Sequence, residues 1–113
     1  MALARAAPPH VERGDGLEVV PTLVARVPPE HVPCVYHSHA IYQMNAEWRA
    51  AFERRIGEIG SQRDLAHVAL EWLGDDPGPR LHLTGWTRGK SSRRLLANCH
   101  HHGRWMEWLD GSQ

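Results

Sequence analysis

The tripeptide His37-Ser38-His39 combines side chains suited to proton transfer, nucleophilic attack and metal binding. It follows an apolar, β-branched and aromatic run from Val32 to Tyr36, which is typical of a strand covered on both faces. Ligands of open α/β sheets collect outside the carboxyl ends of such strands. If the extended geometry continued, His37 and His39 would share one face and could serve a ligand, a catalytic step or one metal ion. Alternatively, one imidazole caps the sheet edge through a backbone hydrogen bond and the other is solvated.

Tyr42 and Asp15 complete the set of candidate residues. Tyr42 lies shortly after the tripeptide, and Asp15 directly precedes a helical pattern. The Asp15 carboxylate would either cap that helix, which is worth about 1 kcal/mol, or bind a hydroxyl or amine of a ligand. We therefore predict that five residues at strand ends face a ligand: Asp15, His37, Ser38, His39 and Tyr42.

The run His100-His101-His102 is similar to a metal-binding tract, and Cys99 beside it adds a soft ligand. Consecutive side chains of a strand or turn diverge, however, and no Cys-x-x-Cys or His-Glu-x-x-His spacing supports a site. We therefore predict a polar turn here and no metal. Ser38 likewise lacks the flanking glycines of a serine hydrolase elbow.

A second cluster, Arg88, Lys90, Arg93 and Arg94, places four positive charges within seven residues. These residues could hold phosphate groups, or they form a solvated turn. No aromatic platform is interleaved with them, so nucleic-acid binding is not expected. The sequence contains no Gly-x-Gly-x-x-Gly and no Gly-x-x-x-x-Gly-Lys-Ser/Thr motif, so nucleotide chemistry by this chain alone is not expected either.

The composition is that of one folded domain or half-domain over residues 1–113. Hydrophobic residues make up 42% and charged residues 23% of the chain, and Lys plus Arg (13) balance Asp plus Glu (13). Two cysteines are too few for a disulfide framework, so we expect reduced thiols. No run approaches the ~20 apolar residues of a membrane-spanning helix. We therefore expect a soluble, cytoplasmic protein without a membrane partner, with a flexible N-terminus over residues 1–9.

Helices and strands alternate along the first part of the chain, and strands alone follow. One helix, capped by Asp15, should be kinked or short because of Pro21 and should end before Pro28. A second helix, capped by Asn45, should cover about Ala46 to Gly60. The expected later strands are Leu65–Trp72, Leu81–Trp86, Arg93–Cys99 and Arg104–Leu109, the last one at an edge, with Thr87 to Ser92 as a connection. Trp86, Trp105 and Trp108 are expected to pack in the core and at the edge. This order predicts an α/β fold with parallel strands first and antiparallel strands after.

Three segments together resemble the bacterial domain of unknown function 2332 family: Arg13-Gly14-Asp15, then Val35-Tyr36-His37-Ser38 with Tyr42, then His102-Gly103-Arg104-Trp105-Met106-Glu107-Trp108-Leu109. The order and spacing match from about residue 10 to 110. The resemblance implies the C-terminal portion of a longer protein with a partial Rossmann-like, class I methyltransferase-like three-layer sheet. On that analogy Asp15 would follow the third strand, near the adenine end of a cofactor, and His37 to His39 would follow the fourth, where substrate is handled.

The resemblance thus implies S-adenosylmethionine as cofactor, but the chain lacks the first two strands with their glycine-rich turn and an Asn/Asp-Pro-Pro-Tyr motif. The leading hypothesis is therefore a methyltransferase-like fragment without autonomous catalysis, whose partner is a missing N-terminal half or a second copy. The alternative is a non-enzymatic binding or assembly module that pairs through an exposed sheet edge. Sequence alone leaves the substrate unknown.

Overall fold

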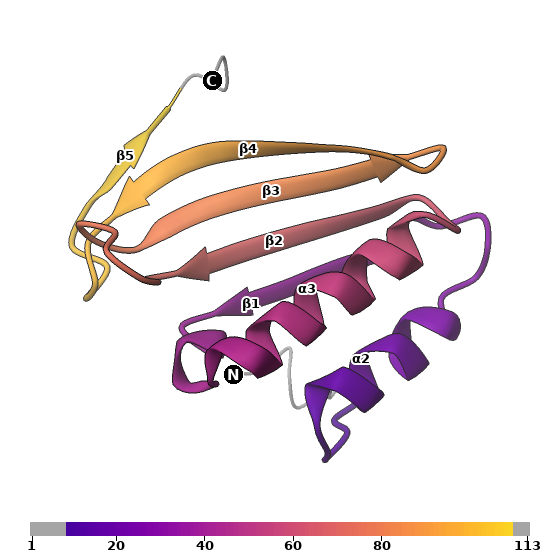
Figure 1. Ribbon diagram of the computed structural model, residues 1–113. Helices are drawn as coiled ribbons and strands as arrows, with labels where there is room; N and C mark the ends of the chain where they lie inside the picture. The colour runs from indigo at the N-terminus through magenta and orange to yellow at the C-terminus, as the bar shows by residue number, and fades with distance from the viewer. Residues whose placement is uncertain (1–8, 110–113) are drawn as a thin grey trace.

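A computed structural model describes residues 9–109 of the chain, so residues 1–8 of the expected flexible segment lie outside it. The described residues form a five-stranded sheet with the strand order β1-β2-β3-β4-β5 (Figure 1). The elements in chain order are α2 (Gly16–Ala25), β1 (Cys34–Ser38), η1 (Ile41–Gln43), α3 (Ala46–Gly60), β2 (Leu65–Glu71), β3 (Arg80–Thr87), β4 (Lys90–Cys99) and β5 (Met106–Trp108). β1 and β2 are parallel, and every later pair is antiparallel. The predicted order of parallel strands before antiparallel strands is confirmed, with one parallel pair.

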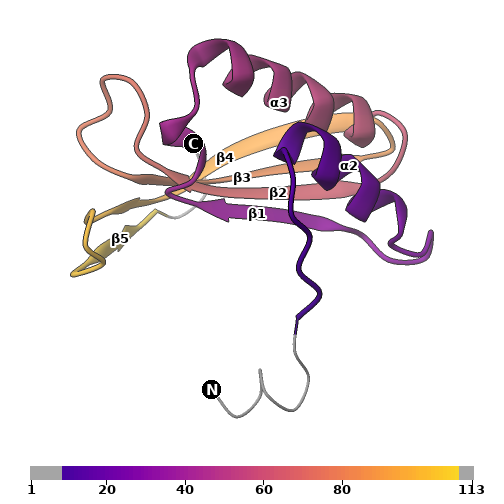
Figure 2. The ribbon, with the colours of Figure 1, turned by 90° about the horizontal axis from the view of Figure 1, so that it is seen from below.

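Both helices lie on one face of the sheet (Figure 2). The described residues therefore form two layers, and the expectation of three layers is wrong for them. The physical reason is the length of the connections: only β1 and β2 are joined by a helical crossover, which parallel strands require. β2 to β5 are joined by loops and turns that contain no helix to cover the second face. Neither described α-helix is long and apolar enough to cross a membrane.

Side-chain caps begin both α-helices at the predicted residues. Asn45 Oδ1 accepts the Trp48 N–H at 2.7 Å at the start of α3, and Asp15 Oδ1 accepts the Leu17 N–H at 2.9 Å at the start of α2. Each bond satisfies a backbone donor that has no partner inside the helix. α2 contains Pro21 and ends at Ala25, ahead of the two prolines, as expected.

The turn between β3 and β4 is tighter than the sequence suggested. Arg88 and Gly89 have φ angles of 53° and 79°, and two positive φ values in a row are typical of a type I′ hairpin turn. β4 therefore starts at Lys90, inside the segment expected to be a connection.

The core lies between the helices and one face of the sheet. Its buried members are Val24, Val35, Phe52, Ile56 and Leu65, and Trp86 packs against them. Trp105 and Trp108 are 54% and 63% exposed, so the prediction that they pack is wrong. β5 is the edge strand, as expected, and pairs with β4 through three residues only.

The opposite face of the sheet is largely apolar and carries no helix among residues 9–109 (Figure 2). Strand register places Ser38, Leu70, Leu81, Ala97 and Trp108 in one row across all five strands. Tyr36 lies on the same face, because side chains two apart on a strand share a face, and it is 66% exposed.

Gly60 is required where α3 crosses β3. A Cβ atom there would lie 2.3 Å from Trp86 Cγ, whereas a Cβ at Gly57 in the same helix would meet nothing within 4 Å. We expect Gly60→Ala to lower the free energy of unfolding by about 2 kcal/mol through overpacking. Gly57→Ala should raise it by up to about 1 kcal/mol, because alanine favours the helix. Urea unfolding of both variants checks this, and equal effects would contradict the close packing of α3 on Trp86.

Candidate functional site

A buried chain of hydrogen bonds joins β1 to β2 beneath α3. The period-2 alternation of β2 puts His67, Ala69 and Glu71 on the helix-covered face, and His37 on β1 is the register partner of Ala69. The small Ala69 leaves room for the His37 ring, whose two nitrogens reach the flanking residues. His37 Nδ1 lies 2.6 Å from Glu71 Oε2, and His37 Nε2 lies 2.8 Å from His67 Nε2.

The direction of these hydrogen bonds follows from the carboxylate. Glu71 Oε2 also accepts the Ala40 N–H at 3.1 Å, and an ionised carboxylate has no proton to give, so His37 Nδ1–H donates to it. With His37 neutral, its Nε2 is then the acceptor for His67 Nε2–H. Glu71 Oε1 has no hydrogen-bond partner among the described residues. The arrangement resembles a carboxylate–imidazole–imidazole relay, which orients one imidazole and can pass a proton along its length.

His67 is held neutral by its surroundings. It is 3% exposed, and the edge of Phe52 packs on both imidazoles with ring centroids 5.8 Å from His37 and 6.1 Å from His67. Burial first, and then the Coulombic interactions with His37 and Arg93, lower the pKa of His67 to about 4. A neutral His67 has one ring N–H and one ring acceptor, so it can take part in the hydrogen bond to His37.

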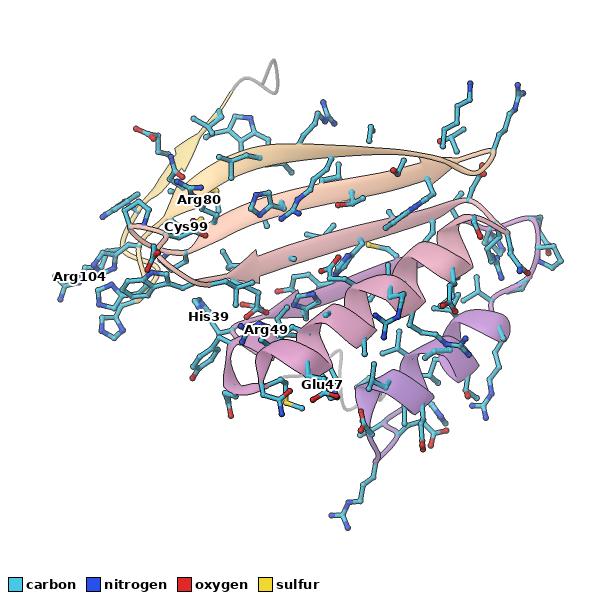
Figure 3. The ribbon with its side chains drawn as sticks, viewed as in Figure 1. His39, Glu47, Arg49, Arg80, Cys99 and Arg104 are labelled. Carbon is cyan, nitrogen blue, oxygen red and sulfur yellow. The ribbon has the colours of Figure 1, made fainter. Side chains whose placement is uncertain are left out.

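The backbone turns sharply after β1, and this turn separates the two histidines of the tripeptide. His39 has a φ of 49°, in the left-handed region that L-residues seldom adopt, and its N–H donates to Leu70 O at 2.8 Å. The expectation that His37 and His39 share a face is therefore wrong, because extended geometry ends at Ser38. The His37 ring packs against Phe52 of α3. His39 lies at the end of β1, the same end of the sheet as Arg80 and Cys99 (Figure 3).

His39 and Tyr42 form one wall of a surface cleft of about 750 Å³. Tyr42 lies on η1, which is anchored by the buried side chain of Ile41, and is itself 52% exposed. Arg49 of α3 also donates to Met44 O at 2.6 Å, directly after η1. The wall is therefore fixed by the sheet on one side and by α3 on the other.

The other wall comes from the loop between β2 and β3 and from the turn between β4 and β5. It consists of Trp72, Gly74, Asp75, Asp76 and His101. Trp72 Nε1 donates to Asp76 O at 2.8 Å, and the Trp72 ring lies 5.7 Å from the His101 ring. The cleft thus opens at the carboxyl ends of the one parallel pair of strands, where α/β sheets bind ligands.

Asp15 and Ser38 are not part of this cleft. Asp15 Oδ1 accepts the Leu17 N–H and also the Trp48 indole N–H at 3.1 Å, so it caps α2 and ties it to α3. Ser38 lies on the uncovered face of the sheet. The structure therefore brings His39 and Tyr42 together, places His37 directly behind their loop, and separates the other two candidates.

The histidine run forms a turn, and the basic cluster is divided between the two faces of the sheet. The backbone N–H of His102 donates to His100 Nδ1 at 3.1 Å, and residues 100–103 form a turn, as predicted. Nowhere in residues 9–109 do three His, Cys, Asp or Glu side chains come together as metal ligands. Arg93 and Arg94 are consecutive on β4 and face opposite sides of the sheet, so the basic cluster is no continuous patch. Cys34 and Cys99 are both free thiols, as expected.

Sequence reasoning missed His67, Glu71, Trp72 and Asp75. Residues 65–72 form a nearly continuous apolar run, in which the polar side chains of His67 and Glu71 are easily overlooked. The alternation of His67, Ala69 and Glu71 was the available signal, since it predicts two polar side chains on one face of a strand. Nothing local in the sequence indicated that the loop after β2 faces the loop after β1.

Comparison with known proteins gives one match. The sequence matches the family described as "Uncharacterized protein conserved in bacteria (DUF2332)" over residues 1–108. No curated protein and no solved structure matches the chain significantly.

The burial of His67 predicts a loss of stability in acid. Its pKa is about 4 in the folded state against 6.5 without the surroundings, so the unfolded chain binds more protons between these pH values and folding weakens as the pH falls. The loss by pH 4 is on the order of 3 kcal/mol. Chemical unfolding of the wild type and His67→Gln at several pH values measures it, and the exposed His31→Gln serves as control. We expect a flatter pH dependence for His67→Gln only; parallel curves for all three proteins would contradict this.

Proposed function

The chain belongs to the uncharacterised bacterial family DUF2332, and from its site we propose that it is a cytoplasmic, methyltransferase-like α/β module that binds a small ligand and does not catalyse alone. The observation that carries this proposal is the cleft between His39, Tyr42 and Trp72. It lies outside the carboxyl ends of β1 and β2 and has a volume within the usual range for ligand sites.

The backbone beside the cleft supports a binding role. His39 holds a left-handed conformation that costs on the order of 1 kcal/mol or more and persists only where its surroundings fix it. Here the Leu70 carbonyl and the Glu71 carboxylate accept two consecutive N–H groups, those of His39 and Ala40. Strain of this kind concentrates at ligand sites, because it sets side chains in place before the ligand arrives.

We expect catalysis to require a further protein segment, because this chain lacks the motif that would bind the cofactor. S-adenosylmethionine requires a backbone cradle of the glycine-rich type, and no such motif occurs in the sequence. The residues of the cleft do not offer that cradle, so we derive no step through this cofactor. The methyltransferase-like architecture stays a proposal that rests on the resemblance of the motifs.

A ligand screen followed by ¹⁵N–¹H NMR tests the function. Small polar metabolites of mixed charge are titrated together with S-adenosylmethionine, first on the wild type. We expect hits that shift residues 39–42 and 72–76, that weaken about tenfold in Tyr42→Ala, and that Tyr36→Ala leaves unchanged because Tyr36 lies on the opposite face. S-adenosylmethionine should show no saturable binding. Tight binding of this cofactor, or a screen without any ligand at these residues, would refute the proposal.

A second candidate function is assembly through the edge of β1. β2 is its only partner strand among residues 9–109, and parallel strands are usually buried between neighbours. Tyr36 on this edge is also 66% exposed. An exposed edge of this kind is a template for pairing with another chain.

Size-exclusion chromatography with light scattering separates the two candidates. Assembly predicts a mass of at least twice 12.8 kDa, and Tyr36→Lys should return the protein to a monomer, since a charge on an edge strand opposes pairing. Thr22→Lys, on the exposed surface of α2, is the matched control and should leave the mass unchanged. A stable wild-type monomer across the accessible concentration range would exclude self-assembly through this edge.

A further inference from the structure

The charge of the cleft is negative. Asp75 and Asp76 are its two carboxylates, and none of its lining residues among the described ones is lysine or arginine. Asp76 Oδ1 lies 3.3 Å from Arg80 Nη1, so one carboxylate is already paired. Asp75 has no ion-pair partner within residues 9–109. One unpaired negative charge is therefore available to a ligand.

The histidine on the same wall does not cancel this charge. Desolvation, followed by the charges of His102 and His100, lowers the pKa of His101 below its usual value. The lowered pKa favours the uncharged form of His101. An anionic ligand would meet the repulsion of Asp75, with no lysine or arginine in the lining of the cleft to offset it.

Two aromatic rings border the cleft and remain accessible. Trp72 is 43% exposed and Tyr42 is 52% exposed, although both belong to fixed segments. The indole N–H of Trp72 is occupied by Asp76 O, so what this ring can still offer a ligand is its π-face rather than a hydrogen bond. The faces of tryptophan and tyrosine attract cations, and tryptophan does so most strongly.

A buried acceptor lies behind the same wall. Glu71 directly precedes Trp72, its side chain is 3% exposed, and its Oε1 has no partner among the described residues. Its other oxygen holds the loop that carries His39. Glu71 is paired with His37 and does not line the cleft, so Asp75 is the carboxylate that remains available to a ligand.

We propose that the cleft recognises a quaternary ammonium group of a small molecule, with Asp75 as the charge partner and Trp72 and Tyr42 as the aromatic faces. This inference rests on the proposed ligand-binding function and specifies its substrate class. A quaternary ammonium suits the site better than a primary one, because a primary ammonium is strongly hydrated and needs several acceptors to replace its water. Aromatic faces beside one carboxylate provide few acceptors and much polarisable surface.

Choline and its uncharged isostere 3,3-dimethylbutan-1-ol form the decisive pair of probes. Both have the same shape, so the difference in their affinity measures the contribution of the positive charge. In ¹⁵N–¹H NMR titrations of the whole chain we expect choline to saturate shifts at residues 39–42 and 72–76, and the isostere to bind about tenfold more weakly or not at all.

Matched variants test whether Asp75 is the residue that attracts the positive charge of choline. Asp75→Asn should weaken choline about tenfold and leave the isostere unchanged, while Glu53→Gln, which removes an exposed carboxylate on α3, should change neither. Trp72→Phe tests the aromatic face independently and should weaken choline without unfolding the protein, as circular dichroism verifies. Equal binding of choline and the isostere, or an unchanged choline affinity in Asp75→Asn, would overturn the inference.

The outcomes also separate this inference from the function on which it rests. Binding of neutral or anionic metabolites at residues 39–42 and 72–76, with no binding of choline, would overturn the cation specificity and leave the ligand-binding function standing. A cleft that binds neither choline nor any metabolite of the screen would overturn both.

Discussion

The hydrogen bond from His37 to Glu71 fixes the loop that follows β1 at the carboxyl end of the sheet. It joins β1 to β2 at their buried ends, and the same carboxylate oxygen accepts the N–H of Ala40. A buried carboxylate is costly unless it is paired and hydrogen-bonded, so the positions of the strand ends and of the loop are set together. The loop then carries His39 and Tyr42 into the cleft. Loss of the Glu71 side chain would therefore leave the protein without a defined wall there, rather than with one contact fewer.

The elements of the fold that could be predicted were those with local signals. Asn45, the apolar stripe of α3 and Gly60 predicted that helix to the residue, because caps and periodicity act within a few residues of the chain. The number of layers could not be predicted in this way. Whether a helix covers the second face of the sheet depends on the path of the whole chain, and no single segment encodes it.

The residues of the candidate site were likewise predicted where a local sequence signal existed and missed where the signal depended on distant segments. Tyr42 and His39 were found because they follow a strand, and strand ends have a known relation to ligands. His67 and Glu71 were missed because their spacing has meaning only once β2 is known to pack one face under α3. The left-handed turn at His39 was also unpredictable, since it is maintained by Leu70 and Glu71 from a distant segment. For Asp15, in contrast, the sequence offered both a ligand-binding and a capping role. The structure shows that its carboxylate caps α2, which explains its presence without a ligand.

The type I′ turn at Arg88 and Gly89 has a consequence for how the molecule assembles in time. Tight hairpins close within microseconds, whereas a parallel strand must wait until its crossover has formed. β3 and β4 are therefore expected to meet early, and β2 joins them through a short loop. β1 arrives late, after α3 has folded, since the whole helix lies between it and its partner. The cleft is therefore expected to be the last region to acquire its shape, because it is complete only once β1 and the loop after it have docked.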